Sequence, residues 1–225
     1  MNSHGLGSAP DASSDAESEA GPPTRRPYRS TRRKQQAART RSDVLAAAVR
    51  LFAEHGWSGS TLAAIAREAD VAVETVYGAF GSKKGLLRAA MDVAVVGDAE
   101  PIPFADRPEV VPLGEGDLDQ RLAVGARLTA DVHERSLGVW RAILEASAGD
   151  AEIDGWRAEF EAGRRVEVER SLRRIAERPV PDAIVDVAWV VLGPECYLSL
   201  TRDLGLDRAA YESRVVDTLR RLLAT

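Results

Sequence analysis

Apolar side chains recur every three or four residues over most of this 225-residue chain, and no segment shows the strict alternation of a β-strand. This period places apolar side chains on one face of an α-helix. The predicted helices cover about residues 41–56, 62–69, 73–80, 83–95, 118–133, 136–148, 153–178, 182–202 and 207–223. Thr40, Thr61 and Ser82 are the predicted N-caps of the first, second and fourth of these helices. The sequence therefore predicts an all-α fold of about nine helices.

Charge is distributed unevenly along the chain. The formal net charge is −5, yet residues 24–92 carry 13 basic and 6 acidic side chains, and residues 93–225 carry 17 basic and 25 acidic ones. A basic module on an acidic protein can still bind a polyanion locally. Residues 1–23 are mostly small, polar or acidic, a composition typical of disorder.

The basic charge is densest in residues 24–41, which contain no acid and have Arg32, Arg33 and Lys34 at their centre. Taken alone, such a segment is a solvated basic tail. Directly before a DNA-binding module it is better interpreted as an arm that lies along phosphates or in a minor groove.

Three of the predicted helices follow within about 40 residues, and the last two are joined by a short turn at residues 70–72. This is the layout of a helix-turn-helix. A corner of an ordinary helical bundle has the same period, so the residues themselves must separate the two interpretations.

Those residues resemble a known family. The segment TLAAIAREADVAVETVYGAFGSKKGLL, residues 61–87, is similar to the signature of the TetR-type transcriptional regulators, and AAAVRLFAEHGW, residues 46–57, resembles their first helix. The matching positions are Thr61, Ile65, Ala66, Thr75, Tyr77, Phe80, Ser82, Lys83, Leu86 and Leu87. The resemblance covers about 50 residues. It implies a homodimer that binds a palindromic operator in double-stranded DNA and a small-molecule effector.

The helix-turn-helix residues can be given separate roles. The resemblance implies phosphate contacts for Tyr77 and Lys83. Lys84, at a position where the family often has an acid, can add a further contact, and Thr61 begins a helix whose free N–H groups suit a phosphate. The residues left to face base edges are Val73, Glu74, Thr75, Gly78 and Ala79. None forms the strong arginine–guanine or asparagine–adenine pair, so we expect modest base discrimination and a large contribution from phosphate contacts.

The segment also departs from the family pattern at two positions. Asp70 stands where the family has glycine, and it tolerates a left-handed conformation better than most residues. Ala72 stands where a serine or threonine caps the recognition helix, and its lack of a capping oxygen costs about 1 kcal/mol.

The C-terminal part is expected to hold the effector and the second copy of the chain. The candidate pocket residues, for which plain core packing is the open alternative, are Met91, Val95, Trp140, Leu144, Trp156 and Phe160. The last two predicted helices carry more apolar surface than one chain covers, and Pro194 is expected to kink the first of them. The candidate dimer residues are Val187, Val191, Tyr197, Leu198, Val215, Leu219 and Leu222.

Signals for catalysis, cofactors and membranes are weak. His133 is interpreted as a surface residue of a helix, and no motif for a catalytic triad, a phosphate-binding glycine loop or a metal site is present, so we expect no enzyme, cofactor or metal. Cys196 is the only cysteine. No apolar segment approaches the roughly 18 residues that span a bilayer, and no secretory signal is recognisable, which predicts a cytoplasmic location.

Together these features predict a DNA-binding transcriptional regulator, with repression relieved by a small apolar or amphipathic ligand. The predicted organisation is a disordered tail at 1–23, a basic arm at 24–41, a helix-turn-helix domain at 42–88, and an effector and dimerisation domain at 89–225. The alternative is an interaction protein, or a non-specific DNA binder, that has the same fold but has lost sequence-specific readout.

Overall fold

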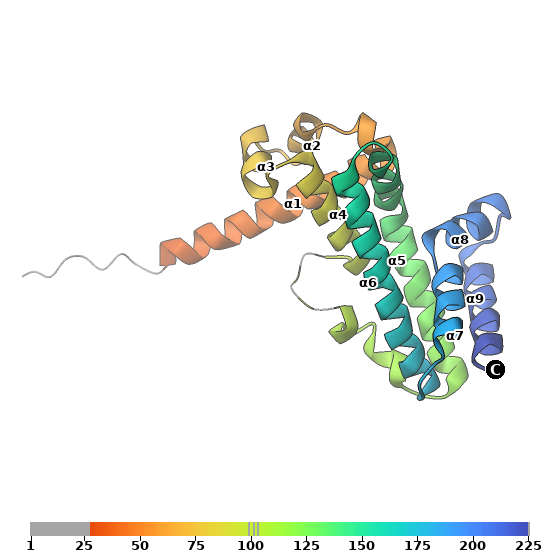
Figure 1. The fold of residues 1–225 in the computed structure, drawn as a ribbon. Coiled ribbons are helices and arrows are strands. Elements are labelled where there is room, and N and C mark those ends of the chain that lie inside the picture. Colours follow the sequence, from red (N-terminus) through yellow and green to blue (C-terminus); the bar gives the residue numbers. More distant parts are fainter. Residues whose placement is uncertain (1–27, 99, 101, 103, 225) are drawn as a thin grey trace, which may run out of the picture.

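The computed structural model describes residues 28–98, 100, 102 and 104–224, and this part of the chain is helical with no strand (Figure 1). The tail predicted at 1–23 and the first four residues of the basic arm lie outside the described residues. The predicted all-α fold is confirmed.

The N-terminal helices form the predicted helix-turn-helix. Helix α1 spans Tyr28–Gly59 with a break at Gly56, whose φ of 67° lies in the left-handed region that favours glycine. Helices α2 (Leu62–Glu68) and α3 (Val73–Phe80) follow. Helix α4 spans Lys83–Val96, and its cap at Ser82 accepts the Gly85 N–H at 3.0 Å, as the sequence predicts.

Helix α1 begins much earlier than expected. The sequence predicts its cap at Thr40, yet the helix already runs through Arg32, Arg33 and Lys34. Residues 32–41 are arginine, lysine, glutamine, alanine and threonine, most of which favour helices, and they include no glycine or proline. The described part of the basic arm is therefore a continuation of α1.

The middle of the chain forms two long helices. Helix α5 (Leu118–Ser147) is continuous, so the break predicted near residue 134 is wrong. Ser136 is buried there and donates its hydroxyl to Val132 O at 2.7 Å, so the polar residues around it do not end the helix. Helix α6 spans Ala151–Ala176.

The connector between α4 and α5 contains two short 3₁₀ turns, η1 (Phe104–Asp106) and η2 (Val111–Gly114). Arg107 is buried and binds Asp98 through two hydrogen bonds of 2.7 and 2.9 Å. The Arg107 guanidinium holds the pKa of the Asp98 carboxyl at about 2, below its ordinary value. This pair fixes the connector to the end of α4.

The C-terminal part is divided where the sequence predicts a kink. Helix α7 (Asp182–Val191) ends before Gly193, and α8 (Pro194–Leu198) continues into the π-helical turn η3 (Ser199–Asp203). Helix α9 (Arg208–Leu223) closes the fold. The described residues thus contain nine α-helices, the predicted number, because one predicted break is absent and the proline kink separates α7 from α8.

Two hydrophobic cores share α5 and α6. One packs α1 to α4 against the C-terminal half of α5, and the other packs the N-terminal half of α5 against the end of α6, α7 and α9. The first core crosses the predicted domain boundary at residue 88 through α4, and the domain division stays a prediction.

Within the described residues, no single helix has the length and apolar character needed to cross a membrane. One pair bent by 42°, Asp182–Val191 with Pro194–Asp203, meets that test by length and composition only.

Candidate nucleic-acid interface and ligand cavity

The turn between α2 and α3 has the geometry that the sequence predicts. Asp70 adopts a left-handed conformation with φ 53°, and the Val71 N–H donates to Ala66 O at 3.0 Å. Ala72 occupies the N-cap of α3 and makes no side-chain hydrogen bond there. The turn survives without its glycine, while the start of α3 lacks a side-chain cap.

One face of α3 is exposed and the opposite face is buried. Val76 is fully buried against α2, whereas the residues predicted to face DNA lie on the outside. The exposed set is Glu74, Thr75, Tyr77, Gly78 and Ala79, and Val73 is half-buried. The outer face of α3 is therefore free to enter a groove.

Thr61 begins α2 as an N-cap, and its hydroxyl oxygen accepts the Ala64 N–H at 3.1 Å. The hydroxyl keeps its own hydrogen as a donor, and the N–H groups at the start of a helix suit a phosphate. Tyr77 on α3 has 53% of its surface exposed.

Lys83 lies differently from the phosphate-contacting lysine that the resemblance implies. Its Nζ donates to Trp57 O at 2.5 Å and stands 4.0 Å from the centre of the Trp57 ring. Burial lowers the pKa of Lys83, although nearby Glu145 opposes the shift. In this conformation Lys83 joins the start of α4 to the end of α1 and is not directed at solvent.

Lys84, the other lysine of this segment, also binds within the protein. Its Nζ lies 2.6 Å from Asp150 and 2.9 Å from Glu152, at the start of α6. Those hydrogen bonds raise the pKa of Lys84. In this conformation the acids at the N-terminus of α6 bind the ammonium group of Lys84, and its contact with a phosphate stays a prediction.

The basic extension of α1 is attached to the recognition helix. Arg41 donates to Ala79 O at 2.9 Å at the end of α3, and its guanidinium lies 4.3 Å from the centre of the Phe80 ring. Nearer the N-terminus of α1, the side chains of Arg32, Arg33 and Lys34 are exposed, and this part of α1 projects past α3 in Figure 1. The structure therefore presents an exposed helix face and a row of cations next to each other.

Further contacts join the helix-turn-helix to the long helices. The Glu145 carboxylate on α5 accepts the N–H groups of Trp57 and Ser58 at 2.8 and 2.9 Å. A hydrogen bond from the Ser58 side chain, together with these two backbone hydrogen bonds, lowers the pKa of Glu145. Arg88 on α4 binds Glu159 on α6 at 3.2 Å. Movements of α5 and α6 can thus reach α1 and α4 directly.

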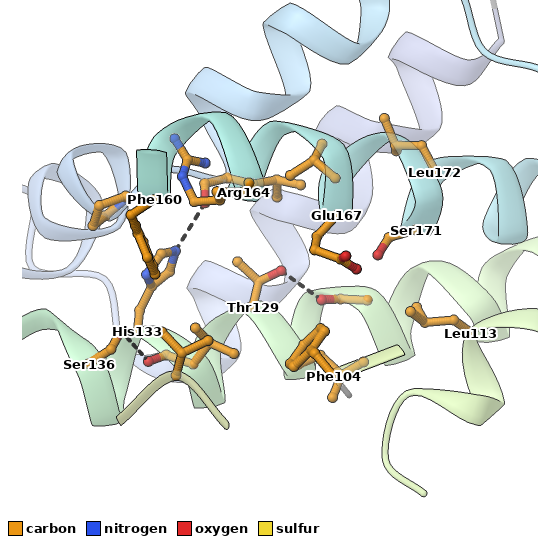
Figure 2. A pocket seen from close by; sticks show the side chains of 18 of the residues that line it. Phe104, Leu113, Thr129, His133, Ser136, Phe160, Arg164, Glu167, Ser171 and Leu172 are labelled. Atoms are coloured by element: carbon orange, nitrogen blue, oxygen red, sulfur yellow. Dashed lines mark hydrogen bonds between the residues drawn. The ribbon is translucent and has the colours of Figure 1, made fainter. Parts of the chain in front are cut away.

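A cavity of about 390 Å³ lies between α4, the connector, α5, α6 and the C-terminal helices. Met91 and Val95 reach it from α4, and Phe104 and Leu113 reach it from the connector. Figure 2 shows Thr129 and His133 extending from α5 toward the side chains of α6. Most of the lining is apolar, so the cavity has the character of a site for a largely apolar small molecule.

The predicted pocket residues fall into three groups. Met91, Val95, Trp140 and Phe160 line the cavity, and the rings of Trp140 and Phe160 are 5.4 Å apart. Trp156 lines a smaller neighbouring pocket together with Arg88. Leu144 lines neither of the two and is 38% exposed.

His133 is buried, so its interpretation as a surface residue is wrong. It is only 5% exposed, its Nε2 lies 3.1 Å from Leu192 O, and its ring centre lies 5.0 Å from that of Tyr197 at a tilt of 35°. Burial lowers its pKa to about 4. Its helical spacing from Ala126, Ala130 and Trp140 is a signal that could have placed it on the inner face of α5.

The surface of α7 carries exposed apolar side chains. Val187 and Val190 are 47% and 60% exposed. Val215 and Leu219, predicted at a dimer interface, are instead buried in the chain's own core, because the apolar stripe of α9 packs against α5. The other candidates, Val191, Tyr197, Leu198 and Leu222, are half-buried.

The part of the chain that the structure describes holds no group of three or more histidine, cysteine, aspartate or glutamate side chains placed to bind a metal ion.

Residues 44–90 match the family model of the bacterial regulatory proteins, tetR family. No curated protein matches the chain in sequence.

Several solved structures share the fold. A protein from Mesorhizobium loti MAFF303099, named as a TetR-family transcriptional regulator, has a TM-score of 0.61 at 19% identity over 84% of this chain and 97% of that one. A transcriptional regulator from Rhodococcus sp. Rha1 has a TM-score of 0.57 at 14% identity over 82% and 96%. The multidrug binding protein EbrR, complexed with imidazole, has a TM-score of 0.53 at 23% identity over 81% and 93%.

Proposed function

We propose that this chain, whose residues 44–90 match the bacterial regulatory proteins, tetR family, is a TetR-family homodimeric repressor that a small molecule releases from a palindromic operator. A DNA-binding regulator of bacterial genes acts in the cytoplasm.

The observation that carries the proposal is the exposed face of α3 beside the cationic extension of α1. Glu74, Thr75 and Gly78 face a major groove, and Thr75 can bond to several bases. Arg32, Arg33 and Lys34 supply the attraction to phosphates that α3 lacks, since Glu74 is the only charged residue of α3. Arg41 fixes the two helices relative to each other.

Helix α4 supports the proposed switch. Its N-terminus follows α3 directly through Gly81 and Ser82, and its C-terminal half supplies Met91 and Val95 to the cavity. A ligand that moves these two side chains would move the start of α4 and the attached α3. In a dimer this movement changes the distance between the two recognition helices. The ligand binds more tightly to the altered arrangement, which does not fit the operator, and DNA binding therefore becomes weaker.

The exposed surface of α7 supports a two-fold dimer. Val187 and Val190 form an apolar patch that one chain leaves uncovered, and the half-buried Val191 follows Val190 in sequence. A two-fold axis would bury the same patch on both copies. Val187→Glu is expected to produce monomers in sedimentation velocity and to reduce operator affinity, with the exposed Val166→Glu on α6 as its control.

The decisive experiment is the selection of bound sequences from a random DNA pool by the full-length protein. We expect an enriched palindrome, and addition of a bound ligand should release that DNA in a mobility-shift assay. Absence of any enriched sequence would support the alternative, a TetR-like interaction protein or a non-specific DNA binder. The uncapped start of α3 and the internally bound Lys83 are the observations that favour this alternative.

A further inference from the structure

The polar groups that line the cavity mainly accept hydrogen bonds. On α5, Thr129 Oγ1 donates its hydrogen to Gly125 O at 2.8 Å, and Ser136 Oγ donates to Val132 O at 2.7 Å. A hydroxyl has only one hydrogen, so each oxygen retains lone pairs and no donor for a ligand. Both hydroxyls therefore present acceptors to the cavity.

His133 is a third acceptor. Its Nε2 lies 3.1 Å from Leu192 O, and a carbonyl oxygen can only accept, so Nε2 carries the hydrogen. Burial keeps the pKa of the ring at about 4, and the ring is neutral at pH 7. The other nitrogen, Nδ1, then carries a lone pair, and in the described part of the chain no donor is bound to it.

Arg164 is the one arginine among the residues that line the cavity, and it is already bound by residues of α6 and α7. Its Nε and Nη2 donate to Glu161 at 3.2 and 2.7 Å, and its Nη1 donates to Trp189 O at 2.8 Å. The guanidinium also lies 4.9 Å from the centre of the Trp189 ring. A carboxylate ligand would have to compete with Glu161 for this cation.

Glu167 adds negative charge at the edge of the cavity. Its side chain is 38% exposed and pairs through Oε1 with the more exposed Arg170 at 2.8 Å. Figure 2 shows Glu167 and Ser171 extending from α6 toward Thr129. Ser171 can donate or accept, while the carboxylate can only accept.

We propose that this cavity recognises an apolar molecule bearing a protonated amine. The ammonium donates to Glu167 and Thr129, and the apolar body lies against Trp140 and Phe160, whose ring faces also attract a cation. An anionic ligand would find as donors in the lining only Ser171 and an Arg164 already bound by Glu161, and any of its oxygens left against the acceptors would be unpaired, which is costly in a largely apolar site. This inference rests on the ligand-binding part of the proposed function and specifies its chemistry.

Three probes with one hydrocarbon body test the inference: 6-phenylhexylamine, 6-phenylhexan-1-ol and 6-phenylhexanoate. Each is titrated into the full-length protein by calorimetry at pH 7.5 and moderate salt, without DNA. We expect the amine to bind at least tenfold more tightly than the carboxylate, with the alcohol between them. Glu167→Gln should reduce the amine-to-carboxylate ratio severalfold. The control Glu169→Gln, which removes an acid that pairs with Arg173 on the same helix outside the cavity, should preserve it.

The outcomes separate the inference from the function on which it rests. Equal binding of amine and carboxylate, or an unchanged ratio in a Glu167→Gln protein that melts like the wild type, overturns the amine assignment and leaves the ligand-relieved repressor standing. Binding of none of the three probes overturns the amine assignment together with the cavity as an effector site. Operator binding, measured separately, tests the DNA-binding half independently of both.

Discussion

The helix-turn-helix and the cavity are built in different ways. The helix-turn-helix depends on residues close together in sequence: Thr61 caps α2, Asp70 makes the turn, and Ser82 caps α4. The cavity is assembled from α4, the connector, α5, α6 and the C-terminal helices, whose lining residues extend from Met91 to Leu219. The helix-turn-helix should therefore respond mainly to substitutions that change surface charge or helix caps, and the cavity to substitutions that change packing or burial.

The largest expected effect is on DNA binding by the helix-turn-helix and its basic arm. Deletion of residues 1–38 removes Arg32, Arg33 and Lys34 with the other cations of the arm, and each lost phosphate contact reduces the slope of log affinity against log salt by about 0.9. We expect operator affinity at moderate salt to fall by about tenfold or more, with a shallower salt slope, in fluorescence anisotropy titrations. If the affinity is unchanged, the arm does not contact the DNA.

The next largest effect concerns the cavity, where the buried His133 makes the stability of the fold depend on pH. His133 has a pKa of about 4 in the folded chain and an ordinary value of 6.5 when unfolded, so between these values only the unfolded chain binds the proton. Stability therefore falls as pH falls from 6.5 to about 4, by at most about 3 kcal/mol. Besides burial, Arg164 lowers this pKa, while Glu195 and the hydrogen bond to Leu192 oppose the shift.

Urea denaturation at several pH values tests this assignment. His133→Leu should be less sensitive to acid than the wild type, and the control His55→Gln, at an exposed position on α1, should keep the wild-type pH dependence. A wild-type dependence in His133→Leu would show that other groups are responsible for the acid sensitivity.

A smaller effect is expected where the two regions meet. A Cβ atom added at Gly138 on α5 would lie 2.3 Å from Cβ of Ala53 on α1. Gly138→Ala should therefore push the helices apart and destabilise the chain by about 1–3 kcal/mol in denaturant titrations. Gly155→Ala on α6 meets nothing within 4 Å and is the matched control. Equal stability of the two variants would show that α1 and α5 can separate at no cost.

The same contrast explains how much the sequence could predict. The two caps, the left-handed Asp70 and the uncapped Ala72 are local patterns, and the structure has each of them. The hydrogen bond of Lys83 to Trp57 O depends on how α4 packs against α1, which no local pattern gives. The burial of His133 could have been predicted from its helical spacing, and the interpretation as a surface residue overlooked that spacing. Four of the six candidate pocket residues line the cavity, because inner helix faces follow from periodicity, but the contribution of the connector through Phe104 and Leu113 has no such signal.

The smallest expected effect lies on the outer face of α3. Glu74 is exposed near the start of α3. Its negative charge interacts favourably with the dipole of the helix, but it repels a DNA phosphate. It can also accept a hydrogen bond from a cytosine amino group in the major groove. Glu74→Ala is therefore expected to change base preference or to raise overall affinity, and not to abolish binding.

Selection from a random DNA pool, followed by titration with the best sequence, separates these results. A changed preferred base identifies Glu74 as a reading residue, whereas an unchanged sequence with affinity raised by about twofold to fivefold identifies electrostatic repulsion, a difference below about 1 kcal/mol. If the sequence preference and the affinity both stay as in the wild type, Glu74 is only solvated. Base readout would then rest on Thr75 and on the methyl groups of Val73 and Ala79, which makes phosphate contacts an even larger share of the affinity.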